Sequence, residues 1–302
     1  MRLEEFPICD AHHHLWDLER MHYPWLSEPE PHDFFLGDYA SLKRNYLPDD
    51  YRRDAAGLNV VATVHVEAEY RRDDQVGETR WLAGIAERYG MPNAIVAHAW
   101  FHRPEAERIL AEQAAFPLVR GIRSKPVTAR RPAESVAGEP GAMDDPAWRA
   151  GLKLLRKYDL SWDLRVPPWH LEEAAGAVAE IPDTPVVLNH LGFPWYRHND
   201  GLETWRRGMT ALAAAPNVMV KLSCLCSEGP WDYENNRGVV LETIDMFGPE
   251  RCMFASNFPV DGLRIGFGEM FRAFERMVAG LSEAERRALF HDNAARFYRI
   301  AA

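Results

Sequence analysis

Short runs of apolar and β-branched residues recur along the chain, each followed by a polar loop and usually by a helical periodicity. Most runs are too apolar to leave one face in water, which is typical of parallel strands covered on both sides by helices. The pattern predicts eight such strands, at 7–14, 60–67, 94–101, 119–124, 161–166, 185–190, 218–223 and 252–257.

Amphipathic stretches with a period near 3.6 lie between these strands, at 77–89, 104–115, 146–158, 170–180, 202–215 and 236–247. A last helix is predicted over 281–299, where Ser282 followed by Glu285 forms a capping-box signature. Eight strands with crossover helices in 302 residues match the α/β fold of a (β/α)8 TIM barrel. Such barrels run as one domain at this length, so we expect a single domain over 1–302.

Two long segments, 16–58 and 125–145, interrupt the alternation and follow predicted strand ends. Barrel active sites are built from loops in that position, so we expect both segments to be lids or pocket walls. We expect Trp16, in the aromatic-rich first segment, to contact substrate, although a packed loop explains its aromatic residues equally well. A disordered insertion explains 125–145 about as well as a lid. Specificity is expected to lie in these loops and in 224–237.

The charge and cysteine content narrow the class of partner. A net charge of -10, with no long basic run, argues against nucleic acid and anionic membranes. The N-terminus has no secretory h-region, and no apolar stretch approaches the roughly 20 residues that span a bilayer. Four cysteines in this length form no disulfide framework. We expect a cytoplasmic protein with a small-molecule substrate, and a homo-oligomer is compatible with the sequence.

Two histidines stand at the end of the first predicted strand, in the segment Asp10-Ala-His-His-His-Leu-Trp-Asp17. Residues two apart in a strand share a face, so His12 and His14 point the same way and His13 points into the barrel wall. Two imidazoles on one face at a strand end can ligate a metal or grip a polarised substrate. The sequence therefore predicts a site at this position.

Ionisable and polar residues recur at the same end of the later strands. They are His65, Glu67, His98, Arg123, Asp163, Arg165, Asn189, His190, Lys221, Ser223, Ser256, Asn257 and Asp261. Because unpaired buried charges are costly, this repeated placement indicates a polar site at the barrel mouth. A strand-end carboxylate such as Glu67 often only orients a neighbour. We also expect Lys221 to reach a sheet-end acid, and Asp163 to pair with a nearby arginine.

The order of these motifs resembles the amidohydrolase superfamily, in the amidohydrolase-2 branch that includes sugar-acid lactonases and 2-pyrone-4,6-dicarboxylate lactonase. The resemblance is carried by residues 10–17, 23–26, 66–68, 78–82, 121–123, 189–192, 220–223 and 254–260. It implies that His12 and His14 form the first-strand metal-ligand pair and that His190 is the sixth-strand histidine. It also implies that Arg123 contacts the substrate's carbonyl or carboxylate.

Asn257 departs from the family pattern, because relatives usually carry there the aspartate that takes a proton from the attacking water. An amide has no useful proton-accepting pKa. Three explanations stay open: the base is elsewhere, with Asp261, His65 or Glu67 in reach; the reaction needs no such base; or the protein only binds its ligand. The bridging lysine or carboxylate and the fifth-strand histidine of two-metal members are also not evident.

The sequence therefore predicts a hydrolase that acts on a small carboxylated or sugar-acid lactone, or a related carbonyl compound. His190, Asn257 and Asp261 form the predicted catalytic set, and Arg123, Glu67, His65 and Trp16 the predicted substrate contacts. A single divalent metal, most plausibly Zn²⁺ on His12, His14 and His190, and a metal-free site are predicted equally. Decarboxylation or lactone isomerisation is the alternative reaction, and a non-catalytic barrel that binds a small acid is the alternative of another class.

Overall fold

The computed structural model describes residues 3–29, 34–197, 200–226 and 230–301. Its eight strands form one parallel sheet in chain order, β1 to β8. The strands are β1 (Ile8–His13), β2 (Val60–Val66), β3 (Ala94–Ala97), β4 (Val119–Ile122), β5 (Ser161–Leu164), β6 (Val186–Leu188), β7 (Val218–Leu222) and β8 (Cys252–Phe254). All eight predicted strands are confirmed, although each ends at least one residue earlier than predicted, so the polar residues at their ends lie outside the sheet.

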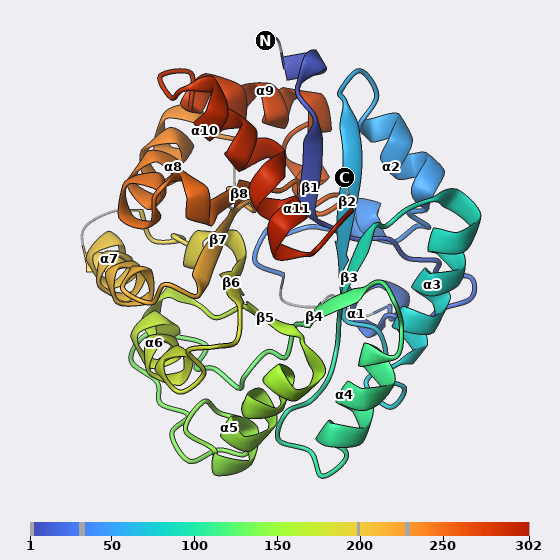
Figure 1. Cartoon of the computed structure of the whole chain (residues 1–302), viewed down its shortest axis with the longest axis vertical. Coiled ribbons are helices and arrows are strands. Elements are labelled where there is room, and N and C mark those ends of the chain that lie inside the picture. Colours follow the sequence, from blue (N-terminus) through green and yellow to red (C-terminus); the bar gives the residue numbers. More distant parts are fainter. Residues whose placement is uncertain (1–2, 30–33, 198–199, 227–229, 302) are drawn as a thin grey trace.

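Helices surround the sheet and alternate with its strands (Figure 1). They are α1 (Pro24–Ser27), α2 (Pro48–Asp54), α3 (Gly77–Tyr89), α4 (Ala106–Ala114), α5 (Pro146–Lys153), α6 (Leu171–Ala179), α7 (Asp200–Ala213), α8 (Tyr233–Phe247), α9 (Phe267–Met277), α10 (Glu283–Arg287) and α11 (Asn293–Phe297). This is the predicted (β/α)8 TIM barrel. The sequence pattern had not predicted α1, α2 or α9.

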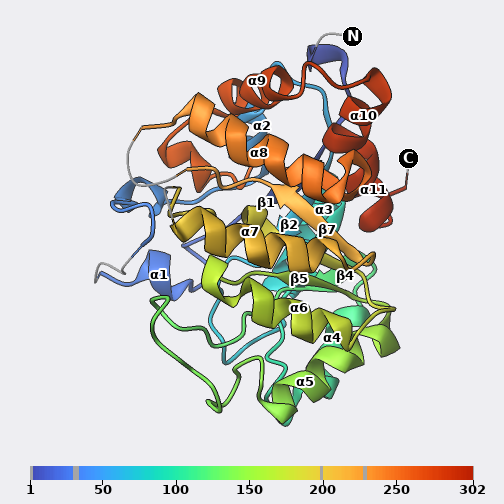
Figure 2. The same cartoon turned by 90° about the vertical axis from the view of Figure 1, so that its left-hand side faces the viewer.

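The expected C-terminal helix over 281–299 begins as predicted, since Ser282 and Glu285 form a capping box. It is not continuous, however, because a π-helical turn, Ala288–Asp292, separates α10 from α11. Leu289 and Phe290 are both buried in this turn, which the wider π geometry allows. Figure 2 shows α11 at one end of the barrel and α1 at the other.

The barrel closes where the end of β1 meets the segment after β8. The His14 N–H donates to the Phe258 carbonyl at 2.8 Å, and the Asn257 N–H donates to the His12 carbonyl at 2.7 Å. The Asp10 carboxylate crosses the same seam, accepting from the Ser256 N–H at 2.8 Å and from the Ser256 hydroxyl at 2.6 Å. The seam therefore fixes His12, His14 and Asn257 relative to one another.

The two ends of the barrel interior differ in chemistry. Small apolar side chains such as Cys9, Ala11 and Val96 fill the lower interior, together with Tyr298 from just beyond α11. The Tyr298 hydroxyl donates to Asp163 at 2.7 Å, and Lys221 Nζ lies 3.2 Å from the same carboxylate. Polar side chains gather instead at the C-terminal ends of the strands. Among the described residues, no helix has the length and hydropathy to cross a bilayer.

Candidate active site

Three histidines meet at the C-terminal mouth of the barrel. The ring centroid of His12 lies 5.0 Å from that of His14 and 4.6 Å from that of His190. His14 Nδ1 donates to the Val66 carbonyl at 2.7 Å, and His190 Nδ1 lies 2.9 Å from Ser223 Oγ. These contacts leave Nε2 of His14 and of His190 for a ligand, and both rings line the central cavity.

The backbone that carries these groups is strained. His190 and Leu191 adopt left-handed conformations, with φ of 60° and 51°, and Asn257 has a φ of 54°. Asparagine and histidine enter this region more often than most residues, but leucine rarely occupies it. Each such residue costs roughly 1–3 kcal/mol, so the surrounding packing holds the His190 ring in place against a local preference.

The three imidazoles are neutral at pH 7. Burial, followed by the nearby Arg123, lowers the pKa of His14 to about 3. Burial also holds the pKa of His12 and of His190 well below the usual range, with Lys221 the next cause for His12 and Arg165 for His190. Neutral rings can accept a proton or a polar hydrogen, and their pKa is low mainly because burial disfavours the protonated form, with the nearby cations adding to this effect.

Arg123 is held in place by Glu67. Its Nε donates to Glu67 Oε1 at 2.7 Å, and its Nη2 donates to the Glu67 backbone carbonyl. Arg72 reaches the same carboxylate at 2.9 Å. Although burial alone would raise it, Arg72 and Arg123 hold the pKa of Glu67 well below its usual range. Arg123 lines the cavity, whereas Glu67 stands behind it as its partner.

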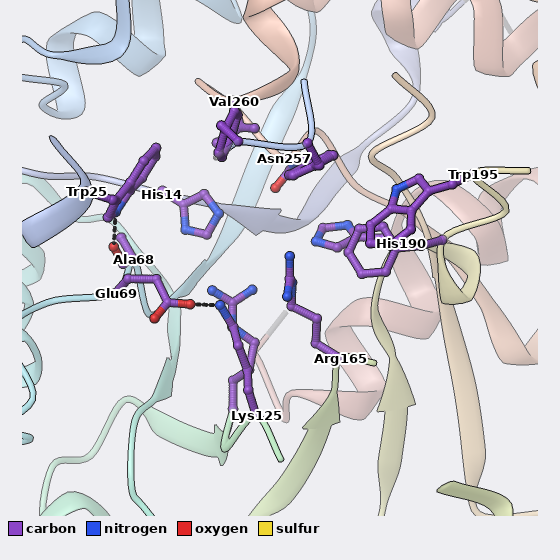
Figure 3. Close-up of a pocket in the computed structure, with 14 residues that line it drawn as sticks. His14, Trp25, Ala68, Glu69, Lys125, Arg165, His190, Trp195, Asn257 and Val260 are labelled. Atoms are coloured by element: carbon purple, nitrogen blue, oxygen red, sulfur yellow. Dashed lines mark hydrogen bonds and ion pairs between the residues drawn. The ribbon is translucent and has the colours of Figure 1, made fainter. Parts of the chain in front are cut away.

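Asn257 and Asp261 form a second pair. Asn257 Nδ2 donates to Asp261 Oδ1 at 2.8 Å, so the Asn257 amide oxygen turns toward the cavity (Figure 3). Asp261 is fully buried, and this burial raises the pKa of its carboxyl to about 7. Asp261 is not among the described residues that line the cavity. The structure thus places Asp261, a predicted candidate for the general base, behind the Asn257 amide.

The cavity itself has a volume of about 490 Å³. It is lined by His14, Trp25, Phe34, Phe35, Ala68, Glu69, Arg123, Lys125, Arg165, His190, Phe193, Trp195, Asn257 and Val260. In Figure 3, Arg165 extends between His14 and His190, and Lys125 pairs with Glu69. The 16–58 segment supplies part of the wall, as predicted. Of 125–145, only Lys125 lines the cavity among the described residues, and part of 224–237 lies outside them.

Three predicted substrate contacts, Trp16, His65 and Glu67, do not line this cavity, and Glu67 contacts Arg123 instead. Trp16 is fully buried, its Nε1 donates to the Arg44 carbonyl at 2.7 Å, and its ring packs against Trp25, which takes the wall position instead. His65 Nε2 contacts the Leu15 carbonyl at 3.3 Å, inside the barrel wall. The predicted wall position of His13 is confirmed, since its ring packs on Tyr51 at 4.7 Å.

The sequence pattern placed Asp163 beside an arginine, but the structure pairs Asp163 with Lys221 and Tyr298. The expectation that Lys221 reaches a sheet-end acid is confirmed. Arg165 is consequently left facing the cavity without that partner. Pairings across a barrel depend on which strands face each other, and the spacing of residues along one strand does not report this.

A metal ion does not fit the three histidines as they are arranged. Arg123 Nη1 lies 3.5 Å from His12 Nε2, the nitrogen that would face a shared ligand. No carboxylate joins the set, and the described residues contain no cluster of three or more His, Cys, Asp or Glu side chains arranged to hold a metal. A cation would therefore enter beside a guanidinium with no anionic ligand to balance it.

Comparison with known proteins agrees with this architecture. The sequence profile of the amidohydrolase family matches residues 9–300. The chain belongs to this family. It is 40% identical to an uncharacterised protein of Sinorhizobium fredii, over 99% of this chain and 100% of that protein. It is 29% identical to an L-fucono-1,5-lactonase of Burkholderia multivorans, over 96% of this chain and 95% of the lactonase.

A solved structure gives the same result for the fold. An amidohydrolase of Burkholderia multivorans, crystallised with bound zinc, superposes with a TM-score of 0.78 at 28% identity. The alignment covers 97% of this chain and 99% of that amidohydrolase. The family resemblance read from the strand-end motifs is thus confirmed, and so is the barrel fold.

Proposed function

We propose that this amidohydrolase hydrolyses the ring ester of a small lactone in the cavity at the mouth of the barrel. One observation carries the proposal: two neutral imidazoles, His14 and His190, and two guanidinium groups, Arg123 and Arg165, converge on a single cavity. Ester hydrolysis needs a proton acceptor for water and positive groups for the developing oxyanion. The lactonase relative supports the same reaction class.

In this proposal His190 is the proton acceptor. Its Nε2 takes a proton from water as the water oxygen adds to the lactone carbonyl carbon. The ester C–O bond then breaks, and the protonated His190 returns the proton to the leaving ring oxygen. Ser223, which contacts His190 Nδ1, keeps the ring oriented. Arg123 stabilises the carbonyl oxygen as it gains negative charge.

Asn257 orients the water and takes no proton. Its amide oxygen, which faces the cavity, accepts a hydrogen bond from the nucleophile. Asp261 fixes that orientation, because a carboxylate only accepts hydrogen bonds and so requires the NH2 group of the amide. Asp261 is a positioning residue in this account.

The test is turnover of a panel that includes L-fucono-1,5-lactone and 2-pyrone-5-carboxylate, followed by pH-stat titration of the acid released. His190→Gln is expected to lower kcat/KM by roughly 100-fold or more, because it removes the proton acceptor. His291→Gln, on a ring that contacts Asp292 away from the cavity, serves as the control and should stay near the wild-type value. No hydrolysis of any lactone, or full activity in His190→Gln, contradicts the proposal.

We also propose that turnover proceeds without a metal, since Arg123 occupies the His12 nitrogen that a metal would need. Protein dialysed against a chelator and checked by elemental analysis is expected to keep its kcat/KM, and added zinc should not raise it. Loss of activity on chelation with recovery on adding zinc would show that Arg123 moves aside and that the three histidines act as ligands.

A further inference from the structure

The walls of the cavity carry more positive than negative charge. Among the described residues that line it or pair with its walls, four are cationic: Arg72, Arg123, Lys125 and Arg165. Two carboxylates, Glu67 and Glu69, form ion pairs with three of these cations. Glu67 pairs with Arg123 and Arg72, and Glu69 pairs with Arg72 and Lys125.

Arg165 is the cation left without a partner. It makes no hydrogen bond or ion pair with any described residue, and its guanidinium lies over the ring of Phe193, 4.8 Å from the centroid. Burial, with Arg123 next, lowers the pKa of Arg165 to about 10, so the group remains charged at pH 7. A partly buried charge without a counter-charge is costly, and proteins retain such groups mainly where a ligand completes them.

The surface beside Arg165 is aromatic. Phe193 and Trp195 lie 4.7 Å apart, Phe35 lies 6.0 Å from each, and Phe34 stacks with Trp25 at 5.5 Å. These rings form one continuous wall of the cavity, because Phe34 also contacts Phe35 at 4.9 Å. Such a wall suits a flat ligand with an apolar face and offers few partners to a ring that carries many hydroxyl groups.

We propose that Arg165 is the specificity residue of this site, pairing with a carboxylate carried on a flat, weakly hydroxylated lactone ring that packs against the aromatic wall. This inference rests on the proposed lactone hydrolysis and narrows its substrate class. It also assigns carboxylate recognition to Arg165 and not to Arg123, whose guanidinium Glu67 already engages. A planar guanidinium binds a carboxylate through two parallel N–H groups, which fixes the orientation of the ring.

The first experiment measures binding, which does not depend on turnover. Thermal shift and calorimetry compare benzoate with benzamide, and 2-pyrone-5-carboxylate with its methyl ester. The two carboxylates are expected to stabilise the wild-type protein and their neutral counterparts are not. Arg165→Met should weaken carboxylate binding by roughly 30-fold or more, whereas Arg165→Lys should keep part of it. Arg237→Met, at an exposed arginine on α8, is the matched control and should bind as the wild type does.

The ligand-free Arg165→Met protein should melt at or above the wild-type temperature, because it loses an unpaired charge and keeps the packing. This readout separates a specificity role from a structural one. Equal stabilisation by acids and neutral analogues, no stabilisation by either, or discrimination that survives in Arg165→Met would overturn the inference.

Turnover then separates this inference from the proposed function. If the wild-type protein hydrolyses neutral sugar lactones with a kcat/KM at least equal to that for flat carboxylated lactones, the chain is a lactonase and the carboxylate assignment is wrong. If no lactone is hydrolysed but carboxylates bind through Arg165, the proposed function fails and the charge recognition stands.

Discussion

At the scale of single residues, the Asn257–Asp261 pair shows how an amide can replace the expected acid. The four-residue spacing and the left-handed φ at Asn257 bring its NH2 group onto the buried Asp261 carboxylate. The group that faces the cavity is therefore the Asn257 amide oxygen, which accepts hydrogen bonds but does not act as a base. The sequence identified both residues, but it did not show which of the two faces the substrate.

Exchanging the pair tests this arrangement. Asn257→Asp alone places two carboxylates in contact, so we expect it to be destabilising, by roughly 1–3 kcal/mol. The double variant Asn257→Asp/Asp261→Asn restores the hydrogen bond with its polarity reversed and presents a carboxylate to the cavity. Its stability should recover toward the wild-type value, and its kcat/KM should acquire a new acid limb in the pH profile. Urea unfolding and pH–rate profiles measure both effects.

The single variant Asp261→Asn completes the comparison. If the changes in the free energy of unfolding of Asn257→Asp and Asp261→Asn simply add up in the double variant, the two residues are not directly coupled and the arrangement is contradicted. A pH–rate profile identical to that of the wild type would show that position 257 does not contact the nucleophile.

At the same scale, the predictions differ in how well they gave the direction in which each side chain points. His12, His14 and His190 gather as predicted, because strand alternation and strand order fix their positions. The assignments of Trp16 and His65 were wrong because Trp16 packs inside the 16–58 segment, and His65, although it lies in β2, turns its ring toward the Leu15 carbonyl in the barrel wall. Lys125 became a site candidate only in the structure, and the unpaired state of Arg165 became visible only once the ion pairs of its neighbours were known. The structure shows that cationic side chains outnumber carboxylates around the cavity, and the order of residues along the chain does not show this.

At the scale of elements, the seam between β1 and the segment after β8 is the critical contact. Asp10 accepts hydrogen bonds from Ser256 on one side and from the Tyr51 hydroxyl of α2, at 2.8 Å, on the other. The Asp10 carboxylate therefore links β1 and the segment after β8 to α2, a helix that the hydrophobic pattern did not predict. Strands are recognisable from apolar runs, whereas this closure depends on side chains far apart in the sequence.

Asp10→Asn is expected to lower the free energy of unfolding by about 2 kcal/mol, since one acceptor oxygen becomes a donor that faces other donors. It should also lower kcat/KM, because His12 and Asn257 lose their common support. Asp183→Asn, at an exposed ion pair with Arg156, should change stability by less than about 0.5 kcal/mol. Chemical denaturation checks both values, and equal effects of the two variants would contradict the role of the seam.

At the scale of the whole molecule, the barrel encloses many neutral histidines. Among the described residues, six buried histidines have a pKa lowered chiefly by burial, namely His12, His13, His14, His65, His98 and His190. In the unfolded chain these groups bind protons below about pH 6.5. The unfolded state then holds more protons, so stability falls as the pH drops below that value.

Three buried carboxyls act in the opposite direction. Burial raises the pKa of Glu78 to about 8, of Asp261 to about 7, and of Asp10 as well. Since these groups are fewer than the histidines, the free energy of unfolding should fall by roughly 2 kcal/mol or more between pH 7 and pH 5. Urea unfolding at the two pH values measures this difference. His98→Gln should narrow the difference, His291→Gln should not, and higher stability at pH 5 would contradict the account.

The whole-molecule features that sequence predicted best are those set by local pattern, namely the strand count, the parallel order and the family. The depth and charge of the cavity depend on how the 16–58 segment folds back over the mouth to place Trp25, Phe34 and Phe35. No periodicity encodes that path, so the substrate-facing wall could not be derived before the structure.

The most direct measurement of the central claim is hydrolysis in ¹⁸O-labelled water, followed by mass spectrometry of the product. Attack of water on the lactone carbonyl, as proposed for His190 and Arg123, predicts a ring-opened acid that carries one ¹⁸O atom in its new carboxylate. Release of carbon dioxide, an unlabelled isomer, or no product from any lactone would contradict lactone hydrolysis at this site.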